Sequence, residues 1–289
     1  MILVTGVSGA LGGLVHGGLA RLADVTAVSG SRSDADRRVD FDDPATLPAA
    51  LSGVDVLVFV SAGYAEDDVV FDRHGALVDA AARAGVRHVV YTSLVGAADR
   101  LSIALPHRWT ERRLAEAPFT TTVLRNGLYA ELAVDWATSA AETAAATGEY
   151  TAPLGTGRVS LAAREDLAEV AVRVAAEASQ DLDAGVPVRH AGRTYELDGP
   201  APIGGADLAE LLAESVARPV AYRSLSTADL RAFLTATPLL PYQVGHTVSM
   251  FNTIRSGLLE STAPGDLAAL LDRAPVSAHA LVRAALAAR

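Results

Sequence analysis

The chain has 289 residues, half of them apolar, and a formal net charge of −10. This length accommodates one large α/β domain or a domain with a smaller lobe, and either can bury a sizeable core. The negative charge argues against direct binding of nucleic acid, which needs clustered cations. The absence of cysteine excludes disulfides, thiol nucleophiles and cysteine-ligated metals.

The 24 basic residues are all arginine, so Schiff-base and Walker-type lysine chemistry is excluded. The seven histidines are far apart and form no HExxH-like pair, so we expect no metal. An apolar strand begins at residue 2 and leaves no room for a signal peptide, which predicts a cytoplasmic protein. Prolines and polar residues interrupt the uncharged stretch 232–254, so we expect no membrane span.

The first predicted element is a strand, residues 2–4, that runs into the glycine-rich segment TGVSGALGG. Apolar residues then recur at helical spacing from residue 10. Gly6, Gly9 and Gly12 follow GxxGxxG spacing, which suits a tight turn, close approach of a pyrophosphate and close helix packing. This strand, loop and helix predict dinucleotide binding, with a purely structural glycine-rich turn as the alternative.

Strands and helices alternate along the next hundred residues. Apolar runs predict buried strands at 25–28, 54–60, 86–92 and 121–124, and helical patterns lie at 45–51, 67–84 and 107–117. Gly85 is the expected stop of the longest helix. This order predicts a Rossmann-type, doubly wound parallel sheet, in which the segment between residues 28 and 45 is too short for a full crossover helix and forms a loop.

After residue 129 the pattern loosens into shorter segments. We expect a strand at RTYELDG and helices at 130–147, 167–179, 206–217, 227–234 and 277–289. Ser226 and Asp229 have the spacing of a capping box. The sequence therefore predicts a dinucleotide-binding core over residues 1–129 and a smaller C-terminal α+β lobe over residues 130–289, with later segments returning to the core.

The end of the second strand favours NADP over NAD. An acidic residue usually binds the ribose 2′-hydroxyl of NAD at this point, whereas arginine accommodates a 2′-phosphate. Here Ser31 and Arg32 precede the first acidic residue, Asp34. The alternative for Arg32 is a solvated loop residue. Asp40 and Phe41 lie where such folds commonly contact the adenine, although a solvated loop carboxylate is an equal alternative.

Several motifs resemble one family in order and spacing: TGVSGALG, VDFDD, AARAGVRHVVYTSL, VLRNGLY and TYELDGP. The chain resembles the NmrA-like atypical short-chain dehydrogenases/reductases, and among them the NADPH:quinone oxidoreductases. The resemblance implies a Rossmann domain that binds NADPH, a smaller lobe closing over a quinone-sized pocket, and hydride transfer to a quinone or related aromatic carbonyl. It leaves open a non-enzymatic NAD(P)-sensing regulator that acts through a protein partner, a dedicated biosynthetic reductase or isomerase, and a homo-oligomer.

The catalytic candidates depart from the usual short-chain pattern. The YxxxK pair cannot exist, because there is no lysine. In the HxxTEK segment of the enzymes that the chain resembles, Arg112 replaces the lysine and keeps the charge but is a poor proton donor. The remaining candidates are Ser93, His107 and Tyr129. His107 could donate a proton because an unperturbed histidine has a pKa near 6.5, or it could be a solvent-facing helix start. Ser93 could instead bond its own loop, and Tyr129 could belong to the core.

The expected cofactor contacts lie at the carboxyl ends of the strands, where ligands bind in open α/β sheets. Small residues after the fourth strand would let the cofactor pass close to the chain, although a plain turn explains Gly63 equally well. The expected set is Gly6, Ser8, Gly9, Ala10, Leu11, Gly12, Ser31, Arg32, Asp40, Phe41, Ser61, Ala62, Gly63, Thr92 and Asn126.

One apolar region is a candidate for contact with an aromatic substrate. The uncharged stretch around Phe233, Tyr242, Met250 and Phe251 would form either an apolar lid over the substrate or simply the core of the lobe.

Overall fold

The computed structural model describes residues 1–62, 64–261 and 265–289. The chain divides into two compact units that are both assembled from separate stretches. Unit 1 comprises Met1–Leu94, Leu105–Asn126 and Glu165–Tyr195, and unit 2 comprises Val95–Ala104, Gly127–Arg164 and Glu196–Arg289. A functional division at residue 129 stays a prediction.

A seven-stranded sheet carries unit 1, in the order β3-β2-β1-β4-β5-β6-β9. Neighbouring strands from β3 to β6 pair in parallel, for example Ile2 opposite Ala27 on one side and Val56 on the other. Its strands are β1 (Ile2–Thr5), β2 (Ala27–Ser31), β3 (Arg37–Arg38), β4 (Val56–Val60), β5 (His88–Leu94), β6 (Thr120–Asn126) and β9 (Thr194–Leu197). This confirms the prediction of a doubly wound Rossmann-type sheet.

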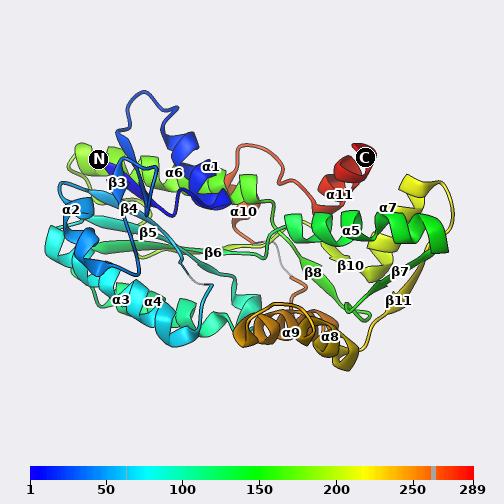
Figure 1. The fold of residues 1–289 in the computed structure, drawn as a ribbon. Helices are drawn as coiled ribbons and strands as arrows, with labels where there is room; N and C mark the ends of the chain where they lie inside the picture. Colours follow the sequence, from blue (N-terminus) through cyan, green and yellow to red (C-terminus); the bar gives the residue numbers. More distant parts are fainter. Residues whose placement is uncertain (63, 262–264) are drawn as a thin grey trace. The chain divides into compact units, whose positions relative to one another are not determined.

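Helices cover both faces of this sheet (Figure 1). One face carries α1 (Ala10–Leu19) and α6 (Arg164–Asp183), and the other carries α2 (Leu47–Leu51), α3 (Asp67–Ala84) and α4 (Ala104–Ala115). The bounds of α3 match the prediction, and Gly85 ends it in the left-handed conformation at φ 76°. Between sheet and helices lies a core of apolar side chains that includes Leu3, Leu57 and Leu77.

The segment expected to be a loop after the second strand is more ordered than predicted. Strand β2 continues to Ser31, and β3 pairs with it at the edge of the sheet. The carboxylate of Asp36 accepts hydrogen bonds from the backbone N–H and the hydroxyl of Ser29, each at 2.8 Å. These bonds turn the chain back beside β2 without a crossover helix. A short 3₁₀ helix, η1 (Pro44–Thr46), then leads into α2.

Unit 2 contains helices around two small sheets. Strands β7 (Glu149–Ala152) and β11 (Ala221–Ser224) pair in parallel, whereas β8 (Arg158–Ser160) and β10 (Pro202–Gly204) pair antiparallel. The helices are η2 (Gly96–Ala98), α5 (Glu131–Thr147), α7 (Gly205–Val216), α8 (Thr227–Thr235), α9 (Pro241–Arg255), α10 (Leu267–Leu270) and α11 (Ala278–Ala287). The predicted cap is confirmed, because the Ser226 side chain accepts from the N–H of Asp229.

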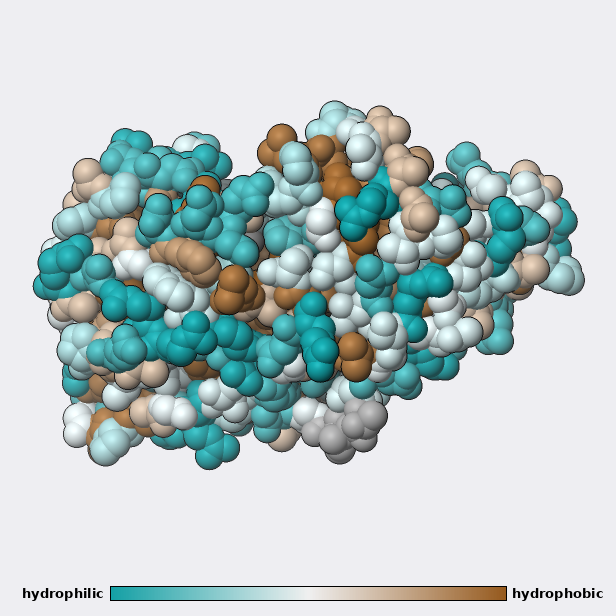
Figure 2. Space-filling model, turned by 90° about the horizontal axis from the view of Figure 1, so that it is seen from below, coloured by the Kyte–Doolittle hydropathy of each residue, from teal (hydrophilic) through white to brown (hydrophobic). Residues whose placement is uncertain are grey.

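The uncharged stretch 232–254 falls mainly in α8 and α9. Within the described residues, no helix combines the length and the apolar character needed to cross a membrane. On the face drawn in Figure 2, hydrophobic residues form separate spots among hydrophilic ones.

Candidate functional site

The loop between β1 and α1 requires glycine at two positions for different reasons. Gly6 has φ 66°, in the left-handed region that other residues rarely adopt. A Cβ on Gly12 would lie 2.3 Å from the carbonyl oxygen of Gly6, so the first turn of α1 packs directly on the loop backbone. The loop is therefore tight, and its form depends on the missing side chains.

The start of α1 is open to an anion. Ser8, Gly9 and Ala10 are exposed, whereas the Leu11 side chain is buried. The N-cap residue is Gly9, which has no side chain to occupy the first amide groups of the helix. A helix N-terminus with free N–H groups and a positive dipole end suits a phosphate.

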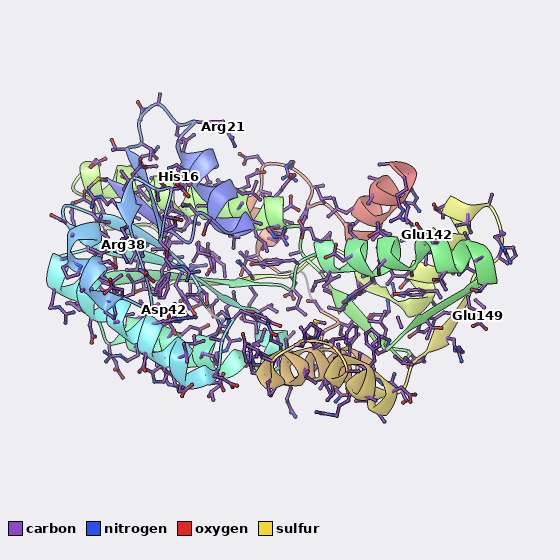
Figure 3. The ribbon with its side chains drawn as sticks, in the orientation of Figure 1. His16, Arg21, Arg38, Asp42, Glu142 and Glu149 are labelled. Atoms are coloured by element: carbon purple, nitrogen blue, oxygen red, sulfur yellow. The ribbon has the colours of Figure 1, made fainter. Side chains whose placement is uncertain are left out.

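At the end of β2, Ser31 and Arg32 behave differently. Ser31 is buried and its hydroxyl donates to the carbonyl oxygen of Ser33. The Arg32 side chain is 73% exposed, and its guanidinium lies 3.9 Å from Asp42, which is bound more closely by Arg73 at 2.8 Å. Figure 3 labels Asp42 in this part of unit 1. Arg32 is thus held weakly enough to bind another anion.

Asp40 and Phe41 have contacts within unit 1 already. The Asp40 carboxylate accepts from the N–H of Asp42, and its own N–H donates to Thr46. The ring of Phe41 stacks on Phe59 with 6.2 Å between the centroids. These contacts shape the turn after β3, and a role for either residue at an adenine stays a prediction.

After β4, buried side chains accept hydrogen bonds from the backbone amides of Ser61 and Ala62, two of the predicted cofactor contacts. The N–H of Ser61 donates to the Thr92 hydroxyl at 3.1 Å, and the N–H of Ala62 donates to Nε2 of His74 at 3.2 Å. Nδ1 of His74 then bonds the Thr110 hydroxyl at 2.7 Å. Gly63 lies outside the described residues.

This arrangement fixes the chemistry of His74. The Thr110 hydroxyl donates to the carbonyl oxygen of Pro106, so it accepts a hydrogen bond from the N–H at Nδ1, and Nε2 is left as an acceptor. Burial, together with the charges of His107 and Arg73, lowers the pKa of His74 to about 3. Neutral His74 therefore ties the end of β4 to α4.

His107 is partly buried beside Tyr91, not a solvent-facing helix start. The Tyr91 hydroxyl lies 2.9 Å from Nδ1 of His107. Burial raises the pKa of Tyr91, so the phenol stays protonated. We assign it as the donor to Nδ1, and with this assignment the proton of neutral His107 lies on Nε2. Burial, with the Arg108 charge, lowers the pKa of His107 to about 4. This lowered pKa differs from the ordinary value near 6.5 on which the expectation was based, and a role for His107 as a donor stays a prediction.

Ser93 is buried at the end of β5 and belongs to a charged cluster. Its hydroxyl donates to Glu111 at 2.5 Å and accepts from Arg108 at 3.2 Å. The Glu111 carboxylate also binds Arg108 at 2.6 Å and is bound by Arg125 through both of its oxygens, at 3.0 and 2.6 Å. We call Ser93, Arg108, Glu111 and Arg125 the Glu111 cluster.

The Glu111 cluster keeps its carboxylate ionised. Burial raises the pKa of Glu111, but the hydrogen bonds from Arg125 and Ser93 and the charges of both arginines outweigh burial and lower it. The Ser93 hydroxyl is committed to this carboxylate. It cannot simultaneously donate a proton to a substrate.

The structure does not bring Arg112 together with the other catalytic candidates of unit 1. Arg112 is exposed on the last turn of α4, where it borders a hollow beside the first residues of β6. His107 lies near the start of the same helix. A catalytic role for Arg112 stays a prediction without a supporting contact.

Asn126, the last residue of β6, has a buried polar atom that lacks a partner. The residue is 5% exposed, and among the described residues nothing forms a hydrogen bond with its side-chain oxygen Oδ1. An unpaired buried amide oxygen is costly. Asn126 lies at the carboxyl end of β6, where a ligand in this fold would form the missing hydrogen bond.

The remaining candidates lie in unit 2. Tyr129 is partly buried, with the Arg164 guanidinium 4.7 Å from its ring centre, and burial raises the pKa of its hydroxyl. Phe251 is buried against Trp136, with 5.5 Å between the ring centroids, so it is core. Phe233 is 65% exposed, and Tyr242 and Met250 are partly exposed.

Sequence reasoning missed His74, Tyr91 and most of the Glu111 cluster. The i,i+3 spacing of Arg108 and Glu111 on one helix was the only local signal for the cluster. Nothing in the sequence pairs Glu111 with Arg125, which lies on a separate strand.

The fold and the glycine loop define a protein of the Rossmann class, with the features of a dinucleotide-binding site. The chain belongs to the NmrA-like family, which matches residues 23–270. It is 32% identical to quinone oxidoreductase 2 of Escherichia coli, covering 83% of this chain and 82% of that protein. It is 30% identical to an NAD(P)H azoreductase of Xenophilus azovorans, covering 82% of this chain and 74% of the relative.

Solved structures agree with this assignment. A triphenylmethane reductase of Citrobacter sp. in complex with NADP(H) is 26% identical, with a TM-score of 0.84 over 98% of this chain and 99% of the other. An NADPH-dependent quinone oxidoreductase of Escherichia coli in complex with NADPH is 28% identical, with a TM-score of 0.83 over 98% of each chain.

Proposed function

We propose that this protein is an NADPH-dependent oxidoreductase that transfers a hydride to a quinone or a related aromatic carbonyl. The observation that carries the proposal is the β1–α1 loop, where Gly12 lies against Gly6 and leaves the exposed N-terminus of α1 facing outward. The names of the relatives, which include quinone, azo and dye reductases, support the acceptor class.

The residues of unit 1 fit this cofactor. Backbone N–H groups of residues 8–11 would hold the pyrophosphate, and the exposed Arg32 would pair with the 2′-phosphate. The unpaired Oδ1 of Asn126 offers an acceptor at the end of β6. When bound, NADPH supplies the hydride.

We assign to His107 the role of a neutral hydrogen-bond donor to the reduced oxygen. With the Tyr91 hydroxyl bonded to Nδ1, the proton on Nε2 would be the one that His107 donates. A quinone suits a weak donor, because the oxygen formed on reduction is a phenolate that carries its own charge. The proposal therefore needs no lysine and no strong acid.

Stopped-flow oxidation of NADPH with a panel of benzoquinones and naphthoquinones tests the activity. We expect rapid oxidation of NADPH by several quinones, and much slower oxidation without an acceptor. Tight binding of NADPH with no oxidation by any quinone would contradict the proposal and favour a cofactor-sensing regulator.

The pH dependence of the same reaction tests His107. A donor that is neutral at pH 7, with a pKa of about 4, predicts a rate that stays level from pH 5.5 to 7.5. A protonated histidine with an ordinary pKa would instead give a rate that falls about tenfold per pH unit above pH 6.5. His107→Gln, which retains a donor, should keep more of the rate than His107→Leu.

A further inference from the structure

Unit 1 has a hollow that the proposed reductase does not use. It lies between the outer part of α4, the face of β6 that carries Thr121, Val123 and Arg125, and the chain that leads into β9. Its volume is about 660 Å³, within the range of small-molecule sites. We call it the α4–β6 hollow.

The α4–β6 hollow concentrates positive charge in an acidic protein. Arg108, Arg112, Arg125 and Arg193 line it, against one lining carboxylate, Glu111. The whole chain has a net charge of −10. A local excess of cations in an acidic protein attracts anions selectively to that point.

Two of these arginines are not neutralised. Among the described residues, no carboxylate forms an ion pair with Arg112 or Arg193. Arg193 is exposed, and its guanidinium lies 5.5 Å from the ring centre of Tyr195, which gives it a preferred position. Arg108 and Arg125 are bound to Glu111, so the free cationic groups stand at the outer rim.

The inner wall adds an unpaired hydroxyl and an apolar surface. The Oγ1 atom of Thr121 is buried and lacks a hydrogen-bond partner among the described residues. Leu114, Phe119 and Val123 supply apolar contacts. A ligand with a charged end and an apolar body would satisfy the arginines, the hydroxyl and this wall together.

The position separates the α4–β6 hollow from the glycine loop. Strands β4 and β5 lie between β1 and β6 in the sheet, which corresponds to about 14 Å at the usual strand spacing. We infer that the α4–β6 hollow is a second binding site, which takes a small organic anion with a carboxylate or sulfonate group on an apolar or aromatic body.

Calorimetric titration with 2-naphthoate tests the site, in the presence and absence of saturating NADPH. We expect binding of 2-naphthoate in both conditions. The neutral analogue 2-naphthalenemethanol and inorganic phosphate should each bind at least about tenfold more weakly, because the alcohol lacks the charge and phosphate lacks the apolar body. Binding should also weaken at 0.5 M NaCl, since exposed charges are screened.

Single variants locate the bound anion. Arg193→Gln and Arg112→Gln should each weaken naphthoate binding about tenfold, and Thr121→Val about threefold. The matched control is Arg113→Gln, which removes the same charge from the neighbouring position of α4, where the side chain faces Asp79 at 2.7 Å. It should bind naphthoate like the unaltered protein.

Three results would overturn the inference: no binding of naphthoate, equal binding of phosphate, or binding that survives both Arg193→Gln and Arg112→Gln. Thermal melting of each variant separates loss of the site from loss of the fold. These titrations do not depend on turnover, so a failure of the proposed reductase activity would leave them unaffected.

Discussion

The glycine loop follows β1, whereas the Glu111 cluster joins β5, β6 and α4. The two regions differ in what determines their structure. In the loop, side chains are absent: a Cβ on Gly12 would meet the backbone of Gly6 at 2.3 Å. In the cluster, three polar side chains from β5, α4 and β6 converge on the Glu111 carboxylate. The first region depends on backbone shape and the second on charge balance. Substitutions in the loop should therefore affect mainly ligand binding, and substitutions in the cluster mainly stability.

The largest effect on stability should come from the cluster. Glu111→Gln removes the charge that Arg108 and Arg125 share, where Glu111 is 13% exposed and the arginines are 17% and 25% exposed. Removing the charge that both part-buried arginines bind should lower the free energy of unfolding by about 3 kcal/mol, measured by chemical denaturation.

The matched control for that change is Glu116→Gln, near the end of the same helix. Glu116 is 71% exposed and lies 4.0 Å from Arg113, so its loss should change stability by less than about 0.5 kcal/mol. Equal effects of the two substitutions would show that the Glu111 cluster behaves as a surface ion pair.

In the glycine loop, the expected effect is smaller on stability and larger on binding. Gly12→Ala forces β1 and α1 apart and should cost about 1–3 kcal/mol. Because the loop shape makes the anion site, NADPH affinity should fall at least about tenfold, measured by fluorescence titration.

The matched control for Gly12→Ala is Gly17→Ala on the same helix. A Cβ there meets only the end of the Arg21 side chain, at 4.0 Å, so this variant should gain up to about 1 kcal/mol from better helix propensity. If both substitutions left NADPH binding unchanged, the loop could not be the cofactor site.

The contrast also explains what the sequence could predict. The glycine loop, the alternation of strands and helices and the bounds of α3 depend on neighbours close in the chain, so local patterns indicate them. The Glu111 cluster joins residues on three elements, and the His74 chain joins β4 to α4. The lowered pKa of His107 likewise comes from burial, which no spacing of residues indicates.

A pH dependence of stability should follow from the buried histidines of unit 1. The pKa of His74 is lowered to about 3, and the values for His88 and His107 are each lowered to about 4, with burial as the main cause. In the unfolded chain these groups take up protons near pH 6.5, so the unfolded state binds more protons and stability falls as pH decreases from 6.5 toward 4.

Each such histidine should contribute up to about 1.4 kcal/mol per pH unit in that window. Denaturation at pH 7.0, 6.0 and 5.0 measures the slope. His88→Gln should reduce the slope of unfolding free energy against pH by the contribution of one histidine. His279→Gln on α11 is the control for replacing a histidine by glutamine. An unchanged slope in His88→Gln would mean that the burial of this histidine is not what couples folding to protons.

The smallest effect on stability and a clear effect on specificity are expected at Arg32, on the rim of the glycine-loop region. Arg32 is 73% exposed and 3.9 Å from Asp42, so Arg32→Glu should change the free energy of unfolding by less than about 0.5 kcal/mol. Opposing the 2′-phosphate with a carboxylate should nevertheless reduce the preference for NADPH over NADH at least about tenfold, measured as the ratio of kcat/KM values.

Arg38→Glu is the control, since Arg38 is 62% exposed and already faces Asp40 and Asp43. If Arg32→Glu left the cofactor preference intact while Arg38→Glu reduced it, the 2′-phosphate would be bound by the edge strand β3 instead of the end of β2.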